Sequence, residues 1–109
     1  MSKFKVGQEL ILEPFRQEPK TYKIIRVETL PYKVKDSLTE DYEDKPDPKN
    51  IAYVLEGETE YFWYNGKCLQ KLAFHKDGDN SYYYPQFLKN YFLVNTAGSK
   101  GDSKDKFKF

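Results

Sequence analysis

The amino-acid sequence predicts a mainly β domain, either a small barrel or a compact antiparallel sheet, with at most one short helical turn. Two observations support this prediction. Aromatic side chains are abundant, with ten Tyr, eight Phe and one Trp among 109 residues, and their broad rings suit the pleated surface of a sheet. Short apolar runs also recur between clusters of Gly, Pro, Asn and Asp, which is typical of short strands joined by turns.

The length fits one domain with one modest core. We expect this domain to occupy residues 1–95. Residues 96–109 are rich in Gly, Ser, Lys and Asp, a composition that predicts a disordered tail.

Residues 8–13 and 21–28 are the first two predicted strands. Each has alternating or continuous apolar side chains next to turn residues. In the second strand, strict alternation places Tyr22, Ile24 and Arg26 on one face and the intervening residues on the other.

Pro31 interrupts the extension of the second strand toward Val34, a break that a bent or edge strand tolerates. Residues 36–50 then change in character, because they hold six acidic and two basic side chains, a net charge of −4, together with two prolines. We expect this segment to be a long, exposed and partly mobile loop. The whole chain has a formal charge of +1, so the remainder carries +5 and the loop creates the charge asymmetry.

Residues 51–56 are the third predicted strand, and residues 59–64 and 67–73 are the next two. The pair Asn65-Gly66 between them is the clearest hairpin signal in the chain. Both residue types accept the positive φ angles of a type I′ turn, which joins antiparallel strands with two residues.

A second hairpin is predicted at residues 77–80, leading into a strand at 82–84. Residues 86–90 follow Pro85 and are the candidate for the single helical turn, because the apolar side chains from Phe87 onward have i, i+4 partners. Residues 91–95 are a final strand or an extension of that turn. About five to seven short strands suit a small barrel.

The opening of the chain, residues 4–12 followed by 21–27, resembles the first two strands of SH3-like barrels. In those barrels a Val-Gly turn, here Val6-Gly7, leads into the first strand, and a loop of variable length precedes the second. The resemblance covers about the first 28 residues. It implies a small β-barrel and assigns no functional residue.

Composition argues against several classes of function. A formal charge of +1 lacks the basic excess of dedicated non-specific DNA or membrane-surface binders. Cys68 is the one cysteine, so no internal disulfide can form, and the apolar run after the basic N-terminus is too short for a signal peptide or membrane span. We therefore expect a cytoplasmic protein. The frequent Lys, Tyr, Phe and Asn have AT-rich codons, which is typical of a phage or a low-GC bacterium.

No residue pattern indicates an enzyme, a cofactor or a metal. A nucleophilic Cys–His pair needs direct contact, but Cys68 and His75 are seven positions apart, which on one strand separates them and turns them to opposite faces. Asp77, Asp79 and Ser81 have the spacing that opens an EF-hand loop, yet the Gly and Glu that this loop requires later are absent. We expect a packed cysteine, a solvated histidine and a hairpin tip.

Two aromatic clusters, at residues 61–64 and 82–84, are the main candidates for a functional surface. Alternate residues of a strand face opposite ways, so each cluster should place at least one large ring outside. Exposed Tyr and Trp are the usual anchors of binding surfaces. We assign Tyr61 and Trp63 as one outward pair and Tyr83 as the middle of the second cluster. In the competing interpretation, a neighbouring segment covers these rings and they belong to the core.

The predicted function is a non-enzymatic protein-binding module in which the acidic loop tunes charge complementarity. Its partner is one protein, for example a host protein modulated by a phage product. The alternative is a small barrel that binds single-stranded nucleic acid by stacking bases on rings in a basic groove. For that groove we assign Lys23, Arg26 and Lys33 as the main basic residues. Further candidates are the basic residues Lys35 and Lys67 and the stacking rings Tyr22 and Trp63.

Overall fold

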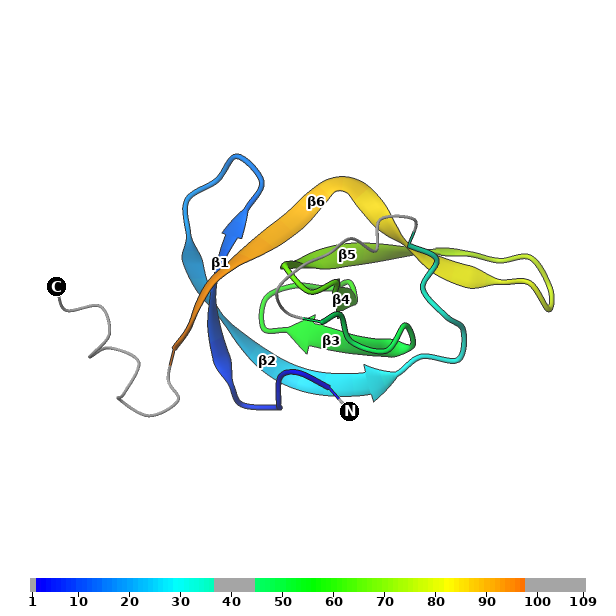
Figure 1. Ribbon diagram of the computed structural model, residues 1–109, viewed down its shortest axis with the longest axis horizontal. Helices are drawn as coiled ribbons and strands as arrows, with labels where there is room; N and C mark the ends of the chain where they lie inside the picture. The colour runs from blue at the N-terminus through cyan, green and yellow to red at the C-terminus, as the bar shows by residue number, and fades with distance from the viewer. Residues whose placement is uncertain (1, 37–44, 98–109) are drawn as a thin grey trace, which may run out of the picture.

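The computed structural model describes residues 2–36 and 45–97. Six antiparallel strands form one sheet that closes into a barrel (Figure 1). Each strand pairs with the next along the chain, and the last pairs with the first. The strands are β1 (Glu9–Pro14), β2 (Lys20–Thr29), β3 (Ile51–Leu55), β4 (Phe62–Tyr64), β5 (Cys68–His75) and β6 (Tyr82–Ala97). The described residues contain no α-helix, and the predicted mainly β class is confirmed.

Strand β2 contains a bulge that strict alternation does not predict. Between Ile24 and Arg26 the pairing advances by two residues on β2 and by one on β3, which leaves Ile25 as the extra residue. Ile25 is exposed, and Val27 packs against the core. Arg26 is exposed as well. The prediction that it shares a face with Ile24 is therefore wrong, because a bulge shifts the facing of the residues that follow it.

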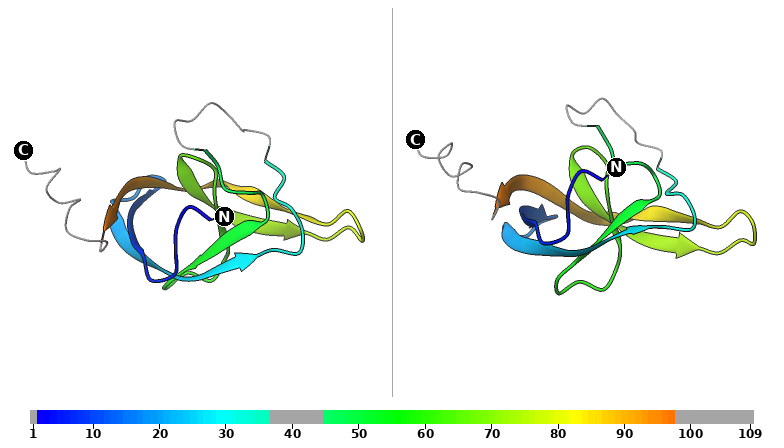
Figure 2. Two further views of the ribbon diagram at one scale, coloured as in Figure 1. Left: turned by 60° about the horizontal axis from the view of Figure 1, so that its bottom comes forward. Right: turned by 90° about the horizontal axis from the view of Figure 1, so that it is seen from below.

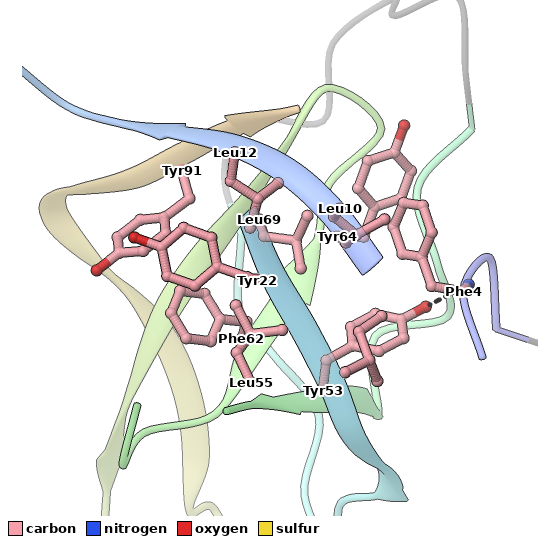
Figure 3. Packing of buried hydrophobic residues seen from close by; sticks show 11 residues of the cluster. Phe4, Leu10, Leu12, Tyr22, Tyr53, Leu55, Phe62, Tyr64, Leu69 and Tyr91 are labelled. Atoms are coloured by element: carbon pink, nitrogen blue, oxygen red, sulfur yellow. Dashed lines mark hydrogen bonds between the residues drawn. The ribbon is translucent and has the colours of Figure 1, made fainter. Parts of the chain in front are cut away.

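Alternate side chains of the strands fill the barrel (Figure 3). The buried members of this cluster are Phe4, Leu10, Leu12, Tyr22, Ile24, Tyr53, Leu55, Phe62, Tyr64, Leu69 and Tyr91. Edge-on ring contacts connect the aromatic members, with ring centres 4.9 Å apart for Phe62 and Tyr91 and 5.1 Å apart for Phe4 and Tyr64. Such T-shaped pairs stabilise the core beyond simple burial. Phe4 precedes β1, so a residue outside the strands completes the core.

A second buried cluster lies outside the barrel, on the face of the sheet that carries Trp63. Its members are Leu30, Val34, Ala52, Trp63 and Leu72. The Trp63 Nε1–H donates a hydrogen bond to the Pro48 carbonyl at 3.0 Å. The predicted bent extension of the second strand does not form. After Leu30 the chain folds over this cluster, and Val34 makes only an isolated parallel bridge to Tyr83.

The hairpin at Asn65-Gly66 forms where the sequence predicts it, but without a type I′ turn. Gly66 has a φ of 103°, whereas Asn65 does not have a positive φ, and a type I′ turn needs both. Instead, the Asn65 Oδ1 accepts hydrogen bonds from the backbone N–H groups of Lys67 and Cys68, each at 2.9 Å. Asn65 therefore acts through its side chain, in the manner of an Asx turn.

Strand β6 includes the segment that was predicted to be a helical turn. Residues 86–90 lie within its 16 residues, so that prediction is wrong. The pairing with β5 jumps from Asn90 to Pro85 on β6 while β5 advances by only two residues. The unpaired residues form a large bulge, in which Leu88 has a φ of 62°. The i, i+4 spacing of this segment thus misled the sequence interpretation, because strand pairing on both sides determines its conformation.

The end of β5 and the start of β6 form a two-stranded ribbon that projects beyond the barrel (Figure 1 and Figure 2). It turns at residues 77–80, as predicted. At its other end β6 continues to Ala97, which pairs with Glu9 of β1. The sheet therefore extends two residues beyond the predicted domain end at residue 95, while residues 98–109 of the predicted tail lie outside the described residues.

The predicted acidic loop is described only in part, because its residues 37–44 lie outside the described ranges. Residues 45–50 form no strand, as expected. Asp47 nevertheless is buried, so the predicted exposure is wrong at this position. Hydrogen bonds from the Lys3 backbone N–H and the Tyr53 hydroxyl hold its carboxylate, which is how a buried charge is normally accommodated.

Candidate functional site

Four aromatic rings form a continuous array on one face of the β5–β6 ribbon. Phe74 and Tyr83 are paired across the ribbon, with ring centres 4.8 Å apart. Phe74 also contacts Tyr32, which follows β2, at 5.6 Å, and Tyr83 contacts Tyr61, which precedes β4, at 6.2 Å. We call these four residues the aromatic array. Phe74 is 44% exposed and Tyr32 36%, while Tyr61 and Tyr83 are half-buried.

Charged residues border the aromatic array at Tyr61. The Tyr61 hydroxyl donates to the Glu28 Oε1 at 2.6 Å, and the Arg26 Nε lies 2.6 Å from the Glu28 Oε2. The hydrogen bond to Glu28 raises the pKa of Tyr61, so this hydroxyl stays protonated at neutral pH and keeps its donor. The array is thus an aromatic centre with a polar edge.

Two of the three predicted anchors belong to the aromatic array and the third does not. Tyr61 and Tyr83 lie in the array, but Trp63 is 0% exposed, so the prediction that it points outward into solvent is wrong. Phe62 and Tyr64 do face the barrel interior and Trp63 the other side, as alternation requires. Leu30 and Val34 pack in its cluster and the Pro48 carbonyl accepts its N–H, so neighbouring segments cover the ring, as in the competing interpretation of the sequence.

The sequence prediction missed the two most exposed members of the array, Phe74 and Tyr32. The sequence does contain a local signal for Phe74. In a hairpin that turns at residues 77–80, positions at equal distances from the turn are paired. Phe74 is then paired with Tyr83, and paired residues share a face of the sheet. Tyr32 has no such signal, since its contact with Phe74 joins segments that are distant in sequence and not paired.

The predicted nucleic-acid residues do not combine exposed basic side chains with exposed rings. Lys23, Arg26 and Lys33 are all exposed, but Arg26 is engaged with Glu28. Tyr22 and Trp63, the rings assigned to base stacking, are buried, and that assignment is wrong.

Lys33 does line an open hollow of about 870 Å³ between the tip of the ribbon and the segment after β2. We call it the ribbon hollow. Its charged and aromatic lining residues are Tyr32, Lys33, Lys35, Asp36, Lys49, Asp79 and Tyr82. The Lys35 Nζ lies 4.3 Å from the centre of the Tyr82 ring, a cation–π contact. Lysines outnumber aspartates by one, so the hollow is only weakly basic.

Cys68 and His75 occupy the two ends of β5. Cys68 is buried, and burial raises the pKa of its thiol to about 11, which keeps it protonated and a poor nucleophile. His75 is exposed and its ring lies 5.0 Å from that of Tyr82. The structure does not bring the two together.

The acidic tip of the ribbon is a hydrogen-bonded turn. The Ser81 Oγ accepts from the Asp77 N–H at 2.8 Å and donates to the Gly78 carbonyl at 2.9 Å. No group of three or more His, Cys, Asp or Glu side chains that could hold a metal ion occurs in residues 2–36 and 45–97.

An ionic cluster that the sequence does not indicate lies beside the core ring of Tyr91. The Lys71 Nζ lies 3.1 Å from Glu58 and 3.7 Å from Glu60, and the Tyr91 hydroxyl donates to Glu58 at 3.3 Å. Burial raises the pKa of Tyr91, so its hydroxyl is not a base at neutral pH. These contacts satisfy polar groups at the edge of the core.

Comparisons with protein-family models, curated proteins and solved structures find no match. Within the described ranges, no helix is long and apolar enough to cross a membrane.

Proposed function

We propose that the protein is a non-enzymatic protein-binding module that uses the aromatic array as its contact surface. The observation that carries this proposal is the continuity of the array, in which exposed Phe74 and Tyr32 contact each other and are joined to half-buried Tyr83 and Tyr61. Phe74 and Tyr83 of the array belong to β5 and β6, whose ribbon projects from the barrel (Figure 2), so a partner can approach these two rings.

Physical chemistry favours such an array as an interface centre. Rings held by neighbouring rings lose little conformational freedom on binding. Aromatic side chains supply most of the anchors in protein interfaces, and a polar rim commonly surrounds them. The Arg26–Glu28 ion pair beside Tyr61 supplies part of such a rim.

Phe74→Ala is expected to weaken partner binding by at least about 2 kcal/mol, the threshold for an anchor residue, and Tyr32→Ala is expected to weaken it in the same direction. The partner is first identified by affinity capture from the native cell and mass spectrometry. The affinity of the purified complex is then measured by titration calorimetry for each variant.

Tyr84→Ala is the matched control for this experiment. Tyr84 neighbours Tyr83 along β6 and is exposed, but alternation turns it to the opposite face of the ribbon. Circular dichroism verifies that each variant keeps the wild-type fold. If folded Phe74→Ala and Tyr32→Ala both bind with wild-type affinity, the aromatic array is not the contact surface.

Binding of single-stranded nucleic acid is a second candidate, supported by the ribbon hollow. Its Lys33, Lys35 and Lys49 could contact phosphates while Tyr32 and Tyr82 stack on bases. A titration with labelled single-stranded DNA at increasing salt tests this candidate, because phosphate contacts require affinity to fall steeply with salt. Lys33→Gln should reduce the salt slope. Absent binding at low salt would exclude it.

Three finer features belong to the same proposal. The barrel is of the SH3-like kind that residues 4–28 resemble, the protein works in the cytoplasm, and it modulates a host protein on behalf of a phage. The closed six-stranded sheet supports the first, and the abundance of residue types whose codons are AT-rich supports the last.

A further inference from the structure

The bulge of β6 presents the most exposed large apolar side chain in the described part of the chain. Phe87 is 86% exposed, and the neighbouring Leu88 is 46% exposed. Residues 86–89 also have no partner in the described ladders, because pairing with β5 resumes only at Pro85 and Asn90. The bulge thus combines exposed apolar side chains with a strand segment that lies outside the ladders on both sides.

The backbone of the bulge is held in an uncommon conformation. Leu88 has a φ of 62°, a region that residues other than Gly, Asn and Asp rarely adopt. Strain of this kind persists when the surrounding structure imposes it, and it concentrates at functional positions. Its local effect is that consecutive side chains, Phe87 and Leu88, are both exposed, where regular alternation would turn one of them inward.

A recess of about 350 Å³ adjoins the protruding ring. Its apolar lining includes Tyr84, Pro85 and Leu88, and Phe87 itself forms one side. Lys35 and Asp36 line the same recess, and Lys89 is exposed next to Leu88. We call this surface the bulge patch. It carries a knob, a hole and charges of both signs.

We propose that the bulge patch is a self-association surface, in which the Phe87 ring of each chain enters the recess of a second copy. A two-fold interface requires one surface to be complementary to itself. The bulge patch meets this requirement in shape, because Phe87 lies beside a recess. It also carries charges of both signs, so it does not strongly repel a second copy of itself.

A second copy fits these observations better than an unrelated protein does. An unrelated partner with its own pocket would need only the protruding ring, and the adjoining recess would have no role. The formal charge of +1 also produces little repulsion between two copies. This inference goes beyond the proposed function, since it uses a surface that contains no member of the aromatic array.

Sedimentation velocity of the full chain over a range of concentrations is expected to detect a reversible dimer. Phe87→Ser should raise its dissociation constant at least about tenfold, since it removes the knob from both chains. Leu88→Gly should also weaken the dimer by removing a wall of the recess. Glycine adopts the positive φ without strain, which protects folding in this variant. Val94→Ser, at another exposed apolar position of β6, is the matched control and should leave the dissociation constant unchanged.

Isotope-filtered NMR of mixed labelled and unlabelled chains locates the contact directly, with intermolecular NOEs expected between Phe87 and Leu88. A wild-type chain that stays monomeric at about 1 mM would overturn the proposal. So would a dimer that Phe87→Ser and Leu88→Gly leave unchanged. Phe74→Ala should keep the dimer intact while it weakens partner binding. If it abolishes the dimer instead, self-association runs through the aromatic array and the bulge patch is not the interface.

Discussion

At the scale of single residues, Asp47 joins the N-terminal segment to the barrel. Its Oδ1 accepts a hydrogen bond from the Lys3 N–H at 2.9 Å, and its Oδ2 accepts one from the Tyr53 hydroxyl. The Tyr53 oxygen in turn accepts from the Phe4 N–H at 3.2 Å, and Phe4 belongs to the barrel core. Burial raises the pKa of Asp47 despite these hydrogen bonds, which act to lower it.

Asp47→Asn is expected to remove part of the pH dependence of stability. The pKa of Asp47 in the folded chain is raised above its ordinary value of 3.8. At pH values between the ordinary pKa and the folded pKa, the folded state therefore binds more protons than the unfolded state. The stability that the Asp47 carboxyl group contributes is therefore fully present below about pH 3.8 and is lost as the pH rises through the folded pKa. The thermal midpoint of the wild type minus that of Asp47→Asn should fall as pH increases between about 3 and 7.

Tyr53→Phe provides the control for this pH dependence. It removes a hydrogen bond that lowers the pKa of Asp47, so the pKa should rise further and the loss of stability with pH should become larger. A difference curve that is flat or that rises with pH would contradict the assignment to Asp47.

At the scale of elements, the hairpin of β4 and β5 determines which side of the sheet each aromatic ring occupies. Three consecutive rings, Phe62, Trp63 and Tyr64, are all buried, two in the barrel and one in the outer cluster. Their register against β5 is Phe62↔Lys71, Trp63↔Gln70 and Tyr64↔Leu69. A slip of one residue would exchange the two faces, so the turn at Asn65 and Gly66 has to be well determined.

Gly66→Val is expected to destabilise the fold by about 1–3 kcal/mol, the range for local backbone strain. Gly66 has a φ of 103°, which a β-branched side chain tolerates poorly. The free energy of unfolding is measured by urea denaturation. Gly66→Asn should cost less, because Asn is the most tolerant replacement at positive φ. Equal stability of the valine variant and the wild type would show that the turn does not need glycine.

Asn65→Gly distinguishes the observed turn from a type I′ turn. Glycine is fully compatible with type I′ geometry, so that turn would predict little loss of stability. The observed turn predicts a loss of about 1–3 kcal/mol, because the N–H groups of Lys67 and Cys68 lose the acceptor that they share. Urea denaturation measures the loss, and an unchanged midpoint would argue for type I′ geometry in solution.

Local signals predicted the strands and both hairpin positions, because Gly, Asn and alternating apolar residues act over a few positions. They also assigned Tyr61 and Tyr83 to the outer surface, although not to one array. They failed where distant segments decide the outcome. Trp63 is buried because residues after β2 pack against it. Asp47 is buried because the Tyr53 hydroxyl and the Lys3 N–H donate hydrogen bonds to its carboxylate. Residues 86–90 follow the pairing of their neighbours rather than their own helical spacing.

At the scale of the whole molecule, the pairing of β1 with β6 closes the barrel. The ladder runs from Pro14↔Tyr91 to Glu9↔Ala97. Without it, β1 and β6 would be the two edges of an open sheet, and edges expose unpaired backbone groups.

A chain that ends at Asn95 is expected to melt at a lower temperature than one that ends at Ala97. The shorter chain lacks Thr96 and Ala97, which pair with Leu10 and Glu9 and extend the closing ladder. A loss of about 1 kcal/mol corresponds to a shift of about 4–8 °C in a domain of this size. Differential scanning calorimetry of the two truncations measures the difference. Equal midpoints would show that closure is complete by residue 95.

The closing ladder also constrains how the chain folds during its synthesis. Every other strand pair joins neighbours in the sequence and can form as soon as both have left the ribosome. Strand β1 is made first but pairs on one side with β6, the last strand, and such distant pairing is slow to form. Until then Leu10 and Leu12, which the finished barrel encloses, have no complete core to enter, so the nascent chain exposes an apolar edge that chaperones can recognise.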